Sequence, residues 1–119
     1  MLSAPNRLRN EKDILRVIKT GRYAAGPNLM VRAAHGGNET RATVVAGLKV
    51  HKKSTLRNLV KRRLREAARE ILKEIVPGYD IVITARAEAV GKNYQDLGNE
   101  LYGLLGRLGL INSKKKPKI

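Results

Sequence analysis

The clearest periodic pattern in the chain lies between residues 55 and 75. Apolar side chains recur there every three or four residues, a spacing that places them on one face of an α-helix. They are Leu56, Val60, Leu64, Ala67, Ala68, Ile71 and Ile75. Pro77 and Gly78 follow directly, and both residues end helices. The pattern predicts one long amphipathic helix that begins at Ser54 or Thr55.

Two further helices are predicted near the ends of the chain. Asn10 can cap the first, which Gly21 ends. Its apolar face comprises Ile14, Val17 and Ile18. Asn93 can cap the second, which Gly109 closes. Its apolar face comprises Leu97, Leu101, Leu104, Leu105 and Leu108.

Segments 29–34, 42–50 and 80–85 are predicted strands because they are rich in small and β-branched residues. Residues 35–38 have turn chemistry, so a hairpin or meander is expected between the first two strands. The order of helix, strands, long helix, strand and helix predicts an α+β fold with helices packed on a small sheet.

The length of 119 residues and the hydrophobic content of 42% suit one domain, residues 1–119, with one modest core. Residues 1–5 and 113–119 are expected to be flexible. The second of these segments contains three consecutive lysines and a proline.

The charge balance changes the picture from an ordinary small domain to a nucleic-acid-binding one. Twenty-five Lys and Arg residues against ten Asp and Glu residues give a formal charge of +15. A compact domain with this charge repels itself unless a polyanion neutralises it. Phe and Trp are absent and only four tyrosines are present, so charge and backbone contacts must supply most of the affinity for a nucleic acid.

Several classes of protein are disfavoured. The sequence has no cysteine, which excludes disulfides and thiolate metal sites. No apolar stretch approaches the roughly 18 residues of a membrane span, and residues 1–10 lack the apolar run of a secretory signal. We therefore expect a cytoplasmic location and no membrane partner.

The long predicted helix and the loop before it hold the densest charge. From Lys49 to Arg65 there is no acidic residue. Each residue of a helix is turned by about 100° from the one before it, so residues four apart lie close to the same side. One side of the predicted helix, beside its apolar face, therefore carries Arg57, Lys61, Arg65 and Arg69, together with Asn58 and Arg62. The segment predicts a helix anchored by its apolar face, with an outward basic strip that can contact successive phosphates.

The run from residue 57 to residue 66 resembles the signature of the bacterial ribonuclease P protein, an Arg-Asn-Arg core followed by Lys-Arg and Arg-Glu. Other segments of that family recur in the same order, so the resemblance covers about residues 6 to 111. They are Asn6-Arg7-Leu8-Arg9, Gly47-Leu48-Lys49-Val50, Gly78-Tyr79-Asp80-Ile81-Val82-Ile83 and Gly109-Leu110.

The sequence departs from the family pattern in three places. Leu59 stands where the core motif has a third basic residue. The place of that missing basic residue in RNA binding is taken either by Leu59 itself or by Arg63. Ile14 and Ile18 stand where relatives often carry phenylalanines, and Arg32 stands where a strand tyrosine is common. The substrate groove is therefore expected to be less aromatic than in relatives.

The resemblance implies a two-layer sandwich of order αβββαβα, with a four-stranded sheet and a left-handed βαβ crossover. It implies a protein that assists a catalytic RNA subunit, which holds Mg²⁺, in removing the 5′ leader from precursor tRNA. The RNA-subunit-binding residues would be Lys52, Lys53, Arg57, Asn58, Lys61, Arg62 and Arg65. The precursor-tRNA leader would lie in a groove between the first helix and the sheet, lined by Ile14, Ile18, Met30 and Arg32.

Three other functions are weighed against this one. A structural RNA-binding protein, such as a small ribosomal protein, would show the same charge and size. A helix-turn-helix regulator would need two short helices joined by a tight turn. A protein-only nuclease would need clustered carboxylates, whereas Glu66, Glu70 and Glu74 at helical spacing suit ion pairs with Arg69 and nearby lysines. His51 suits an RNA contact or solvation better than general-base catalysis. No catalytic residue and no metal ligand is predicted in the protein itself.

Overall fold

The computed structural model describes residues 7–111, so the predicted flexible segments 1–5 and 113–119 lie outside the described residues. The elements are α1 (Glu11–Thr20), β1 (Arg22–Ala25), β2 (Leu29–His35), β3 (Arg41–Val45), α2 (Ser54–Ile71), β4 (Tyr79–Ala85) and α3 (Tyr94–Arg107). Two short 3₁₀ helices, η2 (Leu72–Glu74) and η3 (Ala87–Gly91), flank β4. This sequence of elements confirms the predicted α+β order αβββαβα.

The four strands form one sheet of order β1-β2-β4-β3. β2 is antiparallel to β1 and to β4, whereas β3 is parallel to β4. The hairpin predicted between segments 29–34 and 42–50 is therefore wrong, because β4 lies between β2 and β3. Its run Ile81-Val82-Ile83 is buried on both faces, which suits a central strand. The hairpin is instead formed by β1 and β2.

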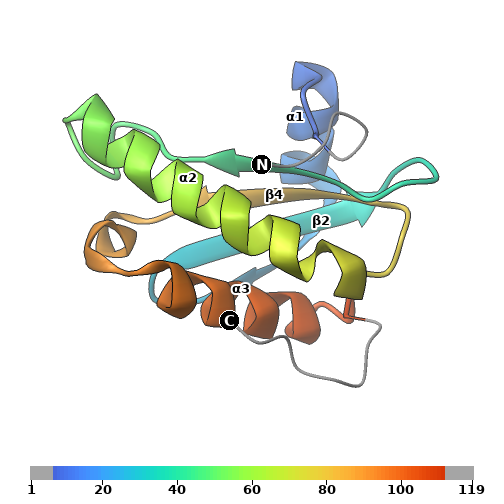
Figure 1. Ribbon diagram of the computed structural model, residues 1–119. Coiled ribbons are helices and arrows are strands. Elements are labelled where there is room, and N and C mark those ends of the chain that lie inside the picture. The colour runs from blue at the N-terminus through green and yellow to red at the C-terminus, as the bar shows by residue number, and fades with distance from the viewer. Residues whose placement is uncertain (1–6, 112–119) are drawn as a thin grey trace.

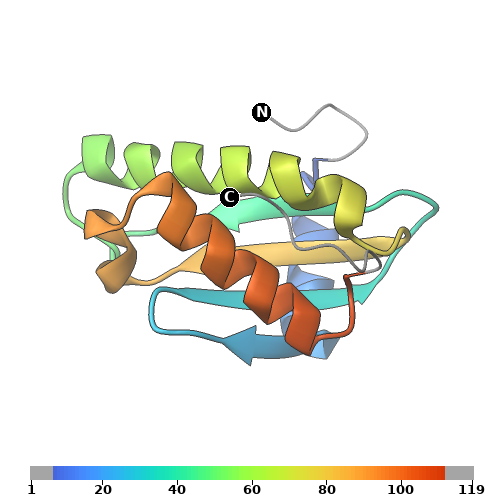
Figure 2. The same ribbon diagram turned by 60° about the horizontal axis from the view of Figure 1, so that its bottom comes forward.

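The connection from β3 through α2 to β4 is a left-handed crossover. β3 and β4 are adjacent and parallel, and α2 crosses in front of the sheet in Figure 2. When that view is turned so that both strands point up, β4 lies to the left of β3. The general preference for right-handed connections predicts the opposite hand, so only the resemblance anticipated this feature.

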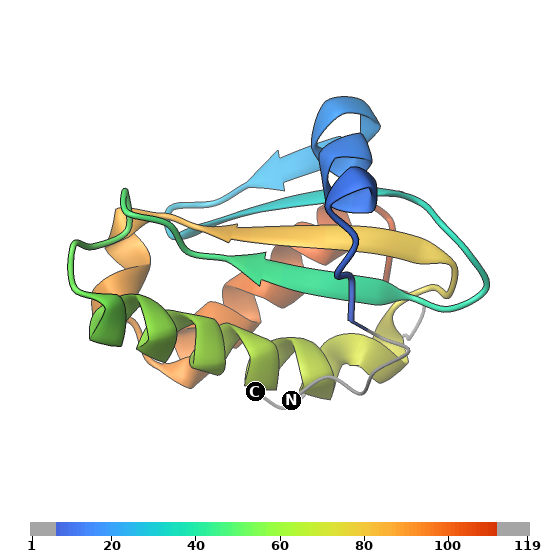
Figure 3. The same cartoon turned by 90° about the horizontal axis from the view of Figure 1, so that it is seen from above.

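Helices lie on both faces of the sheet, as Figures 1 and 3 show. α2 and α3 cover one face and form the expected sandwich with it. The main core lies between these two helices and the sheet. Its largest fully buried side chains include Leu29, Val31, Val60, Leu64, Ile71, Ile81, Ile83, Leu97, Leu101 and Leu105. α1 crosses the other face, where Leu8, Val17 and Val82 form a small second cluster.

The helix ends follow the predicted capping residues. The Asn10 side chain accepts a hydrogen bond from Lys12 N, and the Asn93 side chain accepts one from Asp96 N. Gly109 adopts a φ of 73° after α3, a conformation that favours glycine. The long helix begins at Ser54 as predicted, but its last predicted turn is the 3₁₀ helix η2. None of the helices in residues 7–111 is long and apolar enough to cross a membrane.

Candidate nucleic-acid interface

The basic residues of α2 are placed by the burial of its apolar stripe. Val60, Leu64, Ala67, Ala68 and Ile71 are buried in the main core. This orientation leaves Lys61 and Arg65 half-buried on one flank of the helix, while Asn58 and Arg62 are exposed. The residues of the predicted strip thus lie partly along the flank of the helix and partly on its exposed face.

Arg57 organises the loop before α2. Its Nη1 donates hydrogen bonds to the carbonyl oxygens of His51 and Lys52, both at 2.9 Å. The His51 ring nitrogen Nδ1 accepts a further bond from Lys53 N at 3.0 Å. Because a guanidinium has five N–H donors, Arg57 retains others for a ligand. The loop is thus held in one shape that leaves the side chains of Lys52 and Lys53 exposed to solvent.

Two further arginines of α2 are engaged within the protein. Arg63 Nη1 donates to the Lys92 carbonyl oxygen at 2.8 Å, which directs this side chain toward the start of α3. Arg69 pairs with Glu66 at 3.1 Å, at the helical spacing that the sequence predicted, and also with the adjacent Glu70 at 3.7 Å. The charge of Arg69 is therefore partly neutralised.

The described residues contain no metal-ligating cluster. Within residues 7–111, no three His, Cys, Asp or Glu side chains gather closely enough to hold a metal ion. The carboxylates of α2 are engaged with Arg69 instead.

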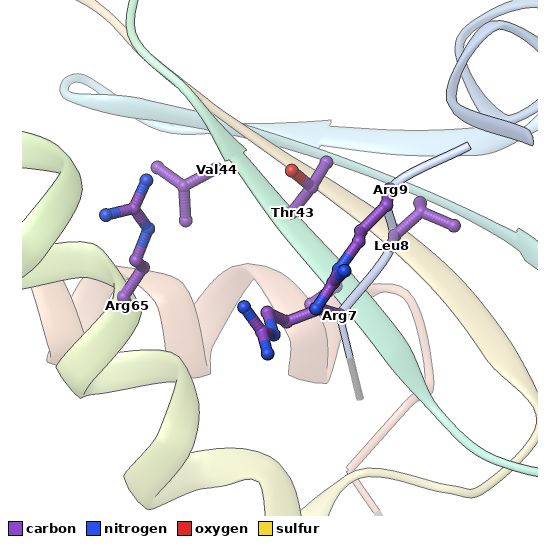
Figure 4. A pocket seen from close by; sticks show the side chains of 7 residues that line it. Arg7, Leu8, Arg9, Thr43, Val44 and Arg65 are labelled. Carbon is purple, nitrogen blue, oxygen red and sulfur yellow. The ribbon is translucent and has the colours of Figure 1, made fainter. Parts of the chain in front are cut away.

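An open pocket of about 260 Å³ lies between α2, β3 and the segment before α1. The guanidinium groups around it come from two sides, Arg7 and Arg9 from the N-terminal segment and Arg65 from α2 (Figure 4). The other lining residues are Leu8, Ala42, Thr43 and Val44. Of the three arginines, sequence reasoning selected only Arg65 as a site residue, because Arg7 and Arg9 belong to no periodic element.

The predicted leader residues share the α1 side of the sheet. Met30 and Arg32 alternate along β2 with Val31, which is buried in the main core on the opposite side. Ile14 packs against the small second cluster, and Ile18 is 39% exposed one helical turn later. Arg32 thus lies on the α1 side of the sheet, and its role in binding RNA stays a prediction.

Sequence reasoning missed one aromatic residue on this side of the sheet. Tyr23 of β1 is paired in register with Arg32 of β2, and its side chain is 63% exposed. The Arg32 Cζ atom lies 6.0 Å from the centre of the Tyr23 ring. β1 has only four residues, too few for its alternation to be read from the sequence.

Charged residues attach α1 to the sheet beside this surface. Arg16 of α1 and Arg41 of β3 both pair with the fully buried Asp80 of β4. Arg41 also lies 3.4 Å from Asp13 of α1. The hydrogen bonds to Asp80 raise the pKa of Arg41 above its ordinary value, so this guanidinium stays charged at every physiological pH.

Comparisons with known proteins agree with this arrangement. The family model described as Ribonuclease P matches residues 2–109. The ribonuclease P protein component of a Pseudanabaena species is 33% identical over 94% of this chain and 98% of its own length. That of Alkaliphilus oremlandii is 34% identical over the same shares. The solved RNase P protein from Thermotoga maritima is 29% identical and superposes with a TM-score of 0.76, covering 85% of this chain and 96% of that one.

Proposed function

Because this chain belongs to the ribonuclease P protein family, we propose that it binds the RNA subunit of ribonuclease P and the 5′ leader of precursor tRNA. In this role it assists the endonucleolytic cut that makes the mature 5′ end of the tRNA. Catalysis belongs to the RNA subunit, which holds Mg²⁺. The protein works in the cytoplasm and binds no metal through its own side chains.

The observation that carries the proposal is the basic surface formed by the loop before α2 and by one flank of α2, a stretch with no acidic residue from Lys49 to Arg65. Lys52 and Lys53 are exposed on a loop that Arg57 holds in place. A preformed array of cations loses less conformational entropy on binding a polyanion than a flexible one. The RNA-subunit surface comprises Lys52, Lys53, Arg57, Asn58, Lys61, Arg62 and Arg65.

The leader surface is the part of the sheet beside α1. Ile14, Ile18, Met30 and Arg32 lie on this side, and Tyr23 adds an exposed ring. An unpaired nucleotide can stack on a tyrosine ring or on a guanidinium plane. Because the two surfaces lie on different elements, contacts with the RNA subunit and with the leader can be separated by substitution.

Reconstitution tests the proposal directly. Purified protein is added to a bacterial ribonuclease P RNA at low Mg²⁺, and cleavage of precursor tRNA is measured. The protein should restore cleavage that the RNA performs poorly alone, whereas protein without RNA should cleave nothing. A lack of stimulation would favour the structural RNA-binding alternative, and robust Mg²⁺-dependent cleavage by RNA-free protein would favour the nuclease.

The affinity for the RNA subunit supplies a second test. If about six phosphates are neutralised, log K should fall with log salt at a slope of about −4 to −5. Arg57→Ala with Lys61→Ala should weaken assembly and flatten this slope. Lys73→Ala with Lys92→Ala removes the same charge from exposed positions outside the proposed surface and serves as the control. A nearly flat salt dependence of the unaltered protein contradicts the proposed interface.

A further inference from the structure

We propose that Arg7, Arg9 and Arg65 form a discrete binding site for one backbone phosphate of an RNA strand at the edge of the sheet. The inference rests on the proposed RNA-binding function and extends it, because Arg7 and Arg9 lie outside the α2 surface. The site is the open pocket between the N-terminal segment, β3 and α2 (Figure 4).

The local backbone explains why Arg7 and Arg9 face the same way. Arg7 forms an isolated parallel bridge with Ala42, and Leu8 N donates to the Ala42 carbonyl oxygen at 3.0 Å. Successive side chains of an extended segment point to opposite sides. Leu8 is only 2% exposed and packs in the second cluster, so Arg7 and Arg9 both turn to the other side, toward the pocket.

Within residues 7–111, no carboxylate neutralises the guanidinium groups of Arg7, Arg9 and Arg65. In the described part of the chain, Arg16, Arg41 and Arg69 pair with carboxylates, and Arg57 and Arg63 donate to carbonyl oxygens. Within residues 7–111, Arg7, Arg9 and Arg65 have no such partner, and no acidic residue lines their pocket. Three cations that share one acid-free pocket favour an anion there.

The position of the pocket favours an RNA phosphate over a free anion. Arg65 belongs both to the pocket and to the basic flank of α2, where Lys61 precedes it by one helical turn. An RNA strand that runs along this flank of α2 therefore reaches the pocket without crossing an acidic residue of the flank. Arginine suits the site because its planar fork can donate two parallel hydrogen bonds to one phosphate.

Positive charge at a sheet edge can also serve to prevent aggregation, and the experiments must distinguish this role from phosphate binding. β3 is an edge strand, and cationic side chains beside an edge discourage pairing with another chain. This use requires only positive charge, so lysine would serve as well as arginine. Phosphate recognition by a paired donor would be impaired by lysine.

The first experiment uses inorganic phosphate and the isolated protein. Arginine Nε–Hε resonances are followed by NMR during a titration with phosphate, with chloride at equal ionic strength as the reference. The resonances of Arg7, Arg9 and Arg65 should shift together and saturate before those of Arg86 and Arg107, which are exposed elsewhere. Uniform, unsaturated shifts of all arginines would overturn the site. This measurement does not depend on whether the protein binds ribonuclease P RNA.

The second experiment measures affinity for ribonuclease P RNA. The variant Arg7→Gln, Arg9→Gln, Arg65→Gln should bind at least about tenfold more weakly and lose about one unit of salt slope. The control Lys73→Gln, Arg86→Gln, Lys92→Gln has the same net charge and should lose less. Replacing the three pocket arginines with lysine should lower the affinity in part. Equal losses for pocket and control variants, or full retention with lysine, would overturn the RNA assignment.

The two experiments also identify the source of the phosphate. Saturable phosphate binding without a specific loss of RNA affinity would mean that the pocket takes free phosphate, which overturns the RNA assignment. If the unaltered protein failed to bind ribonuclease P RNA at all, the proposed function would fail while the phosphate titration still decided the site.

Discussion

Arg41 holds the buried carboxylate of Asp80 with two donors, Nε at 2.9 Å from Oδ1 and Nη2 at 2.8 Å from Oδ2. Arg16 of α1 binds the same carboxylate. Val17 is the only fully buried residue of α1, so apolar packing alone holds this helix weakly against the sheet. Asp80 therefore fixes the position of α1 and with it one wall of the proposed leader surface.

Asp80→Asn should destabilise the protein and loosen α1. The substitution removes the counter-charge that Arg16 and Arg41 share and leaves Arg41 its contact with Asp13, but both arginines are about one-third exposed and partly solvated. We expect a loss of about 2–3 kcal/mol in the free energy of unfolding, measured with urea. Amide exchange should accelerate in α1 more than in α2. The control Glu88→Gln, at an exposed site, should change stability by less than about 0.5 kcal/mol. Unchanged exchange in α1 would refute the positioning role.

Arg57 should contribute through geometry as well as charge. Arg57→Lys keeps the charge but loses both hydrogen bonds to the loop carbonyls, so amides of residues 51–53 should exchange faster. The affinity for the RNA subunit should fall about tenfold, equivalent to about 1.4 kcal/mol. Lys61→Arg is the matched conservative change and should leave the affinity within about twofold. Equal behaviour of the two variants would show that only charge matters at Arg57.

Tyr23 should contribute to discrimination between precursor and mature tRNA. Tyr23→Ala removes the exposed ring beside Arg32 and should weaken precursor binding by about 1–3 kcal/mol, the value of one stacked base. Tyr23→Phe should retain the affinity, and Arg32→Ala should reduce it. Affinities of the holoenzyme for both tRNAs provide the measurement. Equal losses for precursor and mature tRNA would remove this surface from the leader site.

Glu100 should stabilise the β1–β2 hairpin from α3. Its carboxylate accepts hydrogen bonds from Asn28 N, Leu29 N and Asn28 Nδ2, at 2.7–2.9 Å. Glu100→Ala leaves these donors unsatisfied beside the buried Asn28 and should cost about 2–3 kcal/mol in urea unfolding. Asn99→Ala, at the exposed neighbouring position, should be nearly neutral. A similarly small loss of unfolding free energy for both variants would show that Glu100 does not stabilise the hairpin.

The helices could be predicted from the sequence because their signals are local. Apolar spacing, the capping residues Asn10 and Asn93, and Gly109 all act within a few residues of one another, and the structure confirms each of them. The basic residues of α2 could be identified for the same reason, since helical spacing alone places them beside the buried stripe.

The pairing of strands could not be predicted in the same way. The turn chemistry of residues 35–38 suggested that β2 and β3 pair, yet β4 inserts between them from much later in the chain. Local turn preference is outweighed by the burial of β4, whose apolar residues serve both faces of the sheet. The left-handed crossover likewise follows from this arrangement and from no local signal.

The sequence by itself determined the helices, the net charge and the acid-free run of basic residues, because these depend on composition and short spacing. Only the tertiary structure decided that Arg7 and Arg9 share a pocket with Arg65, that Tyr23 lies beside Arg32, and that Asp80 joins two arginines from different elements. These contacts join residues from separate elements. They exist because strand order and helix packing are set by the burial of the whole core, which no local pattern encodes.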